Sequence, residues 1–149
     1  MEEGAKFAAS LYSPQKGGFL CCDGSDLFAQ SDVPVPWTIE VIDEQAVRLQ
    51  LSDGRYLRSD GDAGTPPGLT HEPNATTVWL LLYSSEDGAP GLPGDETPVQ
   101  IKTPFNVFGM GPCLDTDTPT GGGRGKGKYS WCGQGDDAAF WRLKGASTL

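Results

Sequence analysis

The chain has 149 residues, 37% of them hydrophobic, which is the size of one domain and enough apolar material for one core. Its net charge of −9 argues against nucleic acids and anionic membranes as partners. The longest apolar run, Val78 to Tyr83, is too short to cross a bilayer, and the first ten residues show no secretory signal. The expected location is therefore the cytoplasm.

Short alternating segments predict β-strands along the chain. The clearest is 47–51, where Val, Leu and Leu alternate with two polar residues. Turns are indicated by Asp-Gly pairs at 23–24, 53–54 and 60–61, because Gly tolerates positive φ and Asp can bond its own backbone. No segment shows a period of 3.6 residues, so no helix is expected.

Three segments of the chain resemble one another, which indicates an internal repeat. Each contains the pattern Leu-x-x-Asp, and a strand with a tryptophan follows it after 17, 22 or 27 residues. The paired landmarks are Leu20 and Trp37, Leu57 and Trp79, and Leu114 and Trp141. Each unit predicts four strands, so one domain of residues 1–149 holds repeats at about 6–44, 45–83 and 98–145. The extra length falls in loops rich in Gly, Pro and Ser, chiefly 84–98 and 119–128.

The second unit carries a family resemblance. Gly54-Arg55-Tyr56-Leu57-Arg58-Ser59-Asp60-Gly61, which follows the strand 47–51, resembles a repeat of the fascin-like family, and Trp37–Val41 fits the later strand of such a repeat. The resemblance extends roughly from Phe7 to Leu143. It implies an all-β protein, a β-trefoil of three four-stranded repeats with pseudo-threefold symmetry and the repeated Leu and Trp in its core. Another compact β-barrel or a β-sandwich is the alternative fold.

The resemblance implies a non-enzymatic, protein-binding module associated with actin, although a fold alone does not settle function. Fascins that bundle actin join several trefoils, and this chain holds one, which puts bundling in doubt. The alternatives are a protease inhibitor that acts through a surface loop, and a lectin. A lectin of the ricin type is excluded because its Gln-x-Trp pattern precedes none of the repeated tryptophans. The expected partners are thus a protein, actin or a protease, or else a carbohydrate; no cofactor is expected.

The candidate partner-binding residues are Arg124, Lys126, Lys128 and Trp131. The three cations lie in the segment GGGRGKGK of an otherwise acidic protein, where they could hold an anionic surface. The alternative is a solvated loop. Trp131 lies outside the repeated tryptophan positions and could anchor a partner. The alternative is that it packs inward from a strand of the third hairpin.

No catalytic or metal site is predicted. His71, the one histidine, could act as a base or ligand but is interpreted as a surface residue near a loop, and no nucleophile elbow appears. The repeated Asp residues are interpreted as turn formers rather than metal ligands. The sequon Asn74-Ala75-Thr76 matches a glycosylation acceptor, interpreted as chance because no secretory signal precedes it.

The chain has four cysteines. Cys21 and Cys22 are adjacent and cannot easily bond to each other, and no C-x-x-C pattern suggests zinc. The cysteines are interpreted as mainly buried or free thiols. A bridge between Cys113 and Cys132 is the candidate exception.

Overall fold

The computed structural model describes residues 3–24, 26–59, 67–87, 91–104, 112–115, 128–131 and 140–149, with the backbone alone for strand residues 23, 26, 28–30, 112, 115 and 128–131. Within these ranges the chain forms twelve strands and one short 3-10 helix. They are β1 (Lys6–Ser13), β2 (Gly18–Asp23), β3 (Asp26–Ser31), β4 (Pro36–Asp43), β5 (Ala46–Leu51), β6 (Tyr56–Arg58), β7 (Gly68–Thr70), η1 (Ala75–Thr77), β8 (Trp79–Leu82), β9 (Gln100–Lys102), β10 (Pro112–Asp115), β11 (Lys128–Trp131) and β12 (Arg142–Thr148).

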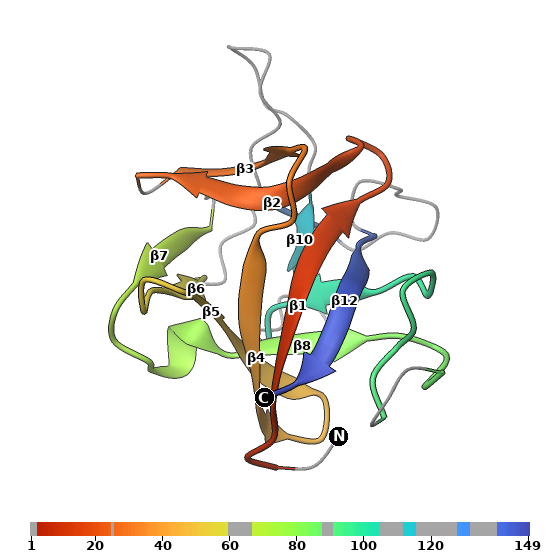
Figure 1. Ribbon diagram of the computed structural model, residues 1–149. Coiled ribbons are helices and arrows are strands. Elements are labelled where there is room, and N and C mark those ends of the chain that lie inside the picture. Colours follow the sequence, from red (N-terminus) through yellow and green to blue (C-terminus); the bar gives the residue numbers. More distant parts are fainter. Residues whose placement is uncertain are drawn as a thin grey trace.

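Six of the strands close into a barrel. Antiparallel pairing runs from β12 to β1, β4, β5, β8 and β9 in turn. Strands β9 and β12 complete the ring through Val99 and Trp141, whose backbones exchange hydrogen bonds of 2.9 and 2.8 Å. Closure satisfies the backbone groups that an open sheet would leave at its edges. In Figure 1, β1, β4 and β12 form the near wall of this barrel.

The other six strands form three hairpins, β2–β3, β6–β7 and β10–β11. Each hairpin joins the barrel through its first strand, because β2 pairs with β1, β6 with β5 and β10 with β9. The hairpin β2–β3 lies across the top of the barrel in Figure 1. Three successive units of four strands, each giving two to the barrel and two to a hairpin, make a β-trefoil. The predicted fold class is therefore confirmed.

One hydrogen bond recurs in all three units. The indole Nε1 of Trp37 donates to the carbonyl oxygen of Leu20 (3.3 Å), Trp79 to Leu57 (2.9 Å) and Trp141 to Leu114 (3.0 Å). All six side chains are fully buried. A buried indole N–H needs an acceptor, and the strand that carries Leu supplies it in each repeat. The repeat seen in the sequence thus has a direct structural counterpart.

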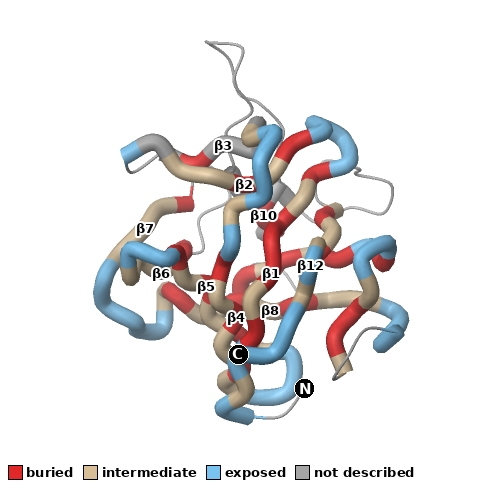
Figure 2. Tube along the Cα trace, in the orientation of Figure 1, coloured by how far each residue is buried: buried red, intermediate tan, exposed pale blue. Residues whose placement is uncertain are grey.

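The barrel strands bury alternate side chains, as a two-residue period requires. Strand β5 buries Val47, Leu49 and Leu51, and β4 buries Trp37, Ile39 and Val41 opposite them. Figure 2 shows the buried residues following the strands and the exposed ones at the turns. The interior is consequently filled by the chain's own aromatic and branched side chains.

The long connection at 84–98 is held against the body. Leu92 belongs to the hydrophobic core and is fully buried, and Pro93 is buried beside it in sequence. The Asp87 carboxylate accepts hydrogen bonds from the Gly94 amide and, at 2.9 and 3.1 Å, from the Thr97 hydroxyl. Composition correctly predicted a loop without strands over its described residues. Among the described residues of this connection, Leu92 is thus anchored in the core and the Asp87 carboxylate is engaged within the connection itself.

Candidate functional site

A surface hollow lies where the β1–β2 turn meets the start of β12. Its described lining residues are Pro14, Gln15, Pro98, Phe140 and Arg142, and its volume is about 390 Å³. We call it the Arg142 hollow. Two prolines and an aromatic ring give it apolar walls, and Arg142 supplies a charge. This volume falls within the range of roughly 300–1,000 Å³ found for ligand pockets.

Strand alternation turns Arg142 outward. Its neighbours Trp141 and Leu143 are fully buried, so the residue between them must face the surface. In the β1–β12 pair it lies opposite Tyr12. Its Nη1 donates to the carbonyl oxygen of Trp141 at 3.2 Å, and it forms no ion pair within the described ranges. Most of the N–H groups of the Arg142 guanidinium therefore remain available to hydrogen-bond an anion.

The next outward cation on β12, Lys144, is already neutralised. Its ammonium group lies 2.6 Å from a Glu96 carboxylate oxygen and 5.8 Å from the centre of the Tyr12 ring. The hydrogen bond and charge of Lys144 hold the pKa of Glu96 below its ordinary value. Arg142 and Lys144 thus share a strand and a face; Lys144 forms the ion pair with Glu96, and the charge of Arg142 also lowers the pKa of Glu96 without an ion pair.

A second hollow, of about 280 Å³, lies further along the same two strands. Its lining includes Pro34, Pro36 and Gly145 together with the Lys144 side chain. Pairing of β1 with β12 is interrupted between Ala8 and Ser10, and Gly145 takes a φ of +67°, a conformation that favours glycine. The hollow therefore lies at the stretch where the β1–β12 pairing is irregular.

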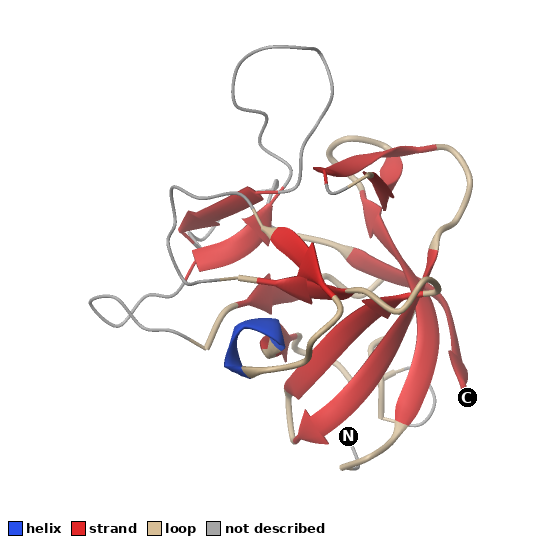
Figure 3. Cartoon of the chain, turned by 90° about the vertical axis from the view of Figure 1, so that its left-hand side faces the viewer, coloured by secondary structure: helices blue, strands red, loops and turns tan. Residues whose placement is uncertain are grey.

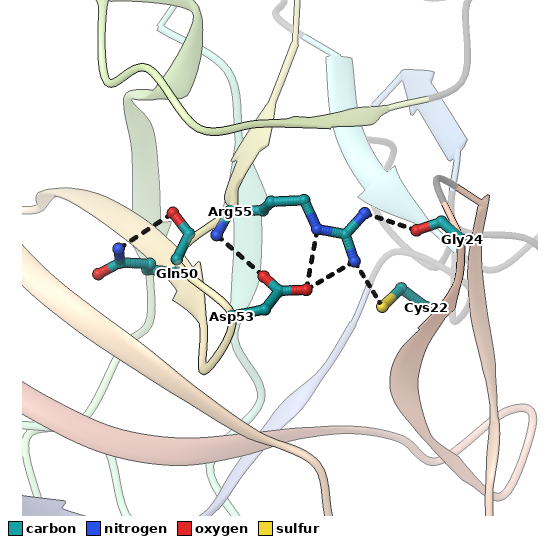
Figure 4. A network of polar contacts seen from close by, with 6 residues as sticks. Cys22, Gly24, Gln50, Asp53 and Arg55 are labelled. Atoms are coloured by element: carbon teal, nitrogen blue, oxygen red, sulfur yellow. Dashed lines mark hydrogen bonds and ion pairs between the residues drawn. The ribbon is translucent and has the colours of Figure 1, made fainter.

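A polar network joins the turns of the first two repeats (Figure 4). The Arg55 guanidinium donates to Asp53 (2.9 Å), to the carbonyl oxygen of Gly24 (2.6 Å) and to the Cys22 sulfur (3.4 Å). Its hydrogen bonds hold the pKa of the Asp53 carboxyl below its ordinary value. All three nitrogen atoms of the Arg55 guanidinium donate to groups of the protein. The network therefore connects the first two hairpins and does not offer a ligand site.

The predicted binding residues fall largely outside the described part of the chain. Arg124 and Lys126 lie beyond the described residues, and of Lys128 and Trp131 only the backbone is described. Lys128 and Trp131 are the first and last residues of β11, where they pair with Asp115 and Pro112. Strand β11 belongs to the third hairpin, as one interpretation of Trp131 assumed. The proposed roles of the four side chains stay predictions.

Among the residues considered for catalysis or metal binding, His71 is the one whose side chain the structure describes. His71 is exposed and lies beside Gly54, where an added Cβ would come within 3.8 Å of its Nδ1. Among the residues described, no group of three or more His, Cys, Asp or Glu side chains is placed to hold a metal ion. Two of the repeated Asp residues, Asp60 and Asp117, lie outside the described ranges.

The cysteines differ in state. Cys113, fully buried on β10, is disulfide-bonded, whereas Cys21 and Cys22 are half-buried thiols outside any disulfide. The state of Cys113 agrees with the candidate exception that the sequence offered, and the other two described cysteines are free thiols as interpreted. Cys132, its expected partner, lies outside the described residues.

Sequence reasoning missed the Arg142 hollow. Its lining includes Pro14, Pro98 and Phe140, and more than forty residues separate each of these from the next along the chain. They meet only because the barrel closes. The available signal was Arg142 itself, an arginine between two core residues of the third tryptophan strand. Alternation alone places such a residue on the surface, but it does not reveal the neighbours that surround it there.

Comparisons with known proteins support the fold. No family model matches the chain, and the search of curated proteins gives no match. Among solved structures, the chain is similar to the designed threefold-symmetric protein ThreeFoil, with a TM-score of 0.66 and 14% identity over 92% of this chain and 97% of that one. An SDF2-like protein from Arabidopsis thaliana gives a TM-score of 0.64 and 11% identity over 100% and 98% of the two chains.

A third similar structure is the Pmt1-Pmt2 protein O-mannosyltransferase complex of S. cerevisiae bound to the sugar donor. Its TM-score is 0.64 at 12% identity, and the match covers 98% of this chain but 25% of that one. Identities this low indicate a shared fold and nothing about activity. In the described part of this chain, no helix has the length and apolar character needed to span a membrane.

Proposed function

We propose that the chain is a binding module without catalytic activity, and that the Arg142 hollow holds an apolar segment of a partner protein that carries a carboxylate. The observation that supports this most strongly is an apolar surface hollow lined by one arginine that forms no ion pair within the described residues, in a protein whose net charge is −9. The filled barrel also favours binding at the surface, because the buried side chains of the core already occupy the interior.

The chemistry of the hollow selects the partner class. The prolines Pro14 and Pro98 and the ring of Phe140 would pack against an apolar side chain, and burial there would supply affinity. A guanidinium recognises carboxylates through two parallel hydrogen bonds, so Arg142 would fix the orientation of an Asp, a Glu or a chain terminus. A peptide segment that places a carboxylate next to an apolar residue satisfies both requirements.

A peptide selection tests this proposal. Random peptides are selected on the immobilised chain, and the enriched peptides are measured against Arg142→Ala and, as a control, Lys6→Ala, which removes an exposed cation at the start of β1. We expect carboxylate-bearing apolar peptides that bind the wild type and Lys6→Ala but lose at least about tenfold in affinity for Arg142→Ala, roughly 1.4 kcal/mol. Equal affinity for all three proteins would reject the hollow as the site.

Actin is the partner that the fascin-like resemblance suggests, and it remains a candidate on that basis alone. Cosedimentation of the chain with actin filaments at low and high salt checks it. We expect any binding to weaken with salt, because the charge of a half-buried surface cation such as Arg142 is partly screened by dissolved ions. A chain that stays in the supernatant at low salt would remove actin from the candidates.

The two alternatives have different support. A protease inhibitor that inserts the loop 84–98 into an enzyme is disfavoured, because Leu92 already anchors that loop in the core. A lectin would use the same surface, with the Phe140 ring as a stacking platform for a sugar. Inhibition assays with a protease panel and a glycan array distinguish these functions from peptide binding.

The cellular compartment of the chain limits which proteins it can meet as partners. A cytoplasmic location is the expectation from the sequence, but disulfides such as that of Cys113 form and persist mainly in oxidising compartments. An oxidising compartment would favour an extracellular or lumenal protein over actin as the partner.

A further inference from the structure

The segment between β7 and β8 holds a rigid turn at Asn74. Asn74 caps the 3-10 helix η1: its Oδ1 accepts hydrogen bonds from the Thr76 amide (2.8 Å) and the Thr76 hydroxyl (2.5 Å). The buried Thr77 hydroxyl donates to the Asn74 carbonyl oxygen (2.8 Å) and accepts from Nε of Arg48 on β5 (3.0 Å). The Thr76 carbonyl oxygen accepts from the Ser59 amide (2.7 Å). The turn is thus fixed to the barrel on its inner side.

The outer side of the turn is open to solvent. Residues 71–75 are all exposed, and η1 lies at the surface below the hairpin β6–β7 in Figure 3. Only the Oδ1 atom of the Asn74 side chain is engaged, since its Nδ2 makes no hydrogen bond within the described residues. A nitrogen that is fixed in place, exposed and not hydrogen-bonded is available for modification.

Sequence and compartment point to one modification. Asn74-Ala75-Thr76 is the acceptor pattern for N-linked glycans, with Ala rather than Pro at the central position. The other asparagine of the chain, Asn106, is followed by Val107 and Phe108 and lacks the pattern. Independently, the disulfide at Cys113 indicates an oxidising compartment, such as the endoplasmic reticulum lumen, where such glycans are added.

We propose that Asn74 carries an N-linked glycan. In the transfer, the Nδ2 atom forms a bond to C1 of the first sugar of a lipid-linked oligosaccharide pyrophosphate. The bond from C1 to the phosphate oxygen breaks, the lipid pyrophosphate leaves with that electron pair, and Nδ2 loses one proton. The Oδ1 atom is untouched, so the cap on η1 survives in the modified protein. This inference uses residues outside the Arg142 hollow and does not depend on the proposed function.

The test is made on the natural protein recovered from its own cells. A sample treated with peptide N-glycosidase is compared with an untreated one by mass spectrometry of the peptide that contains Asn74. We expect the untreated peptide to carry hexose and N-acetylhexosamine mass, and the treated peptide to contain Asp at position 74. A natural protein whose Asn74 peptide has the unmodified polypeptide mass would overturn the proposal.

Three variants made in the same cells separate acceptor chemistry from folding. Asn74→Asp keeps a capping oxygen and removes the acceptor nitrogen, so it should fold and lose the glycan. Thr76→Ala should lose the glycan as well, whereas Thr76→Ser keeps the acceptor pattern and should retain it. Glycan mass that persists elsewhere on the chain in Asn74→Asp, with none at Asn74 in the wild type, would contradict the assignment.

Discussion

The tryptophans and leucines of the three repeats act as pairs. Each indole N–H would be costly to bury without an acceptor, and each leucine carbonyl that accepts from it lies on the first strand of a hairpin. Leaving either group unsatisfied in the core costs about 1–3 kcal/mol. The pairs therefore fix the position of the tryptophan strand against the leucine strand, and this constraint explains why the same two residue types recur although the intervening loops differ in length.

Leu57→Ala tests the core role of these leucines. Leu57 is fully buried, and its truncation should lower the free energy of unfolding by about 2–5 kcal/mol, through lost transfer energy and a residual cavity. Leu149→Ala removes the same atoms from a side chain that is 67% exposed and should change stability by less than about 0.5 kcal/mol. Denaturant unfolding measures both, and equal stabilities would refute the repeat assignment.

Asp87 predicts a pH dependence of stability. Hydrogen bonds from the Gly94 amide and the Thr97 hydroxyl lower the pKa of its carboxyl from the ordinary value of 3.8. A carboxyl with a lowered folded-state pKa stabilises the fold above the unfolded value and loses that contribution as the pH falls through the folded value. Asp87→Ala should therefore melt at a lower temperature than the wild type at pH 7, and the difference should shrink below pH 3.8.

Asp95→Ala is the matched control for this experiment, because it removes an exposed carboxylate from the same connection. We expect the melting temperature of Asp95→Ala to equal that of the wild type both at pH 7 and below pH 3.8. A difference between Asp87→Ala and the wild type that stays constant with pH would show that the charge of Asp87 contributes nothing.

At the scale of elements, the connection 84–98 behaves as part of the body because Leu92 enters the core. Leu92→Ala should release it and make it a preferred site of proteolysis, since cleavage requires a segment that can leave the surface. Limited proteolysis with mass mapping checks this. Glu86→Ala, at an exposed position of the same connection, should be cut as slowly as the wild type. A Leu92→Ala protein cut no faster would mean that other contacts hold the connection.

The strands and the repeat could be predicted because they depend on local alternation and on self-similarity. Val47, Leu49 and Leu51 show the burial that their spacing implies, and the tryptophan positions mark the repeats. The anchoring of Leu92 could not be predicted, since composition around it signals only a loop. The candidate site could not be predicted either, because Pro14 and Arg142 become neighbours only when the barrel closes. A local sequence pattern gives no information about such distant contacts.

At the scale of the whole molecule, the closed barrel is filled by the chain's own side chains, so the proposed binding is expected at the surface. Each barrel strand buries one of its faces in the common core. The surfaces of the three repeats therefore differ in their turns and in the outward side chains of their strands. The first and third repeats meet along β1 and β12, and both hollows lie along that seam. Threefold symmetry of the core thus coexists with surface hollows that lie along one seam.

The covalent state of the molecule gives the last prediction. The chain has four cysteines, of which Cys113 is disulfide-bonded and Cys21 and Cys22 are not. The denatured, unreduced protein should titrate as two thiols, and as four after reduction. Cys113→Ser should titrate as three without reductant, and it should lose about 2–5 kcal/mol of stability, as removal of a native disulfide typically does. Four thiols in the unreduced wild type would contradict the bridge, and they would also remove the compartment argument for a glycan at Asn74.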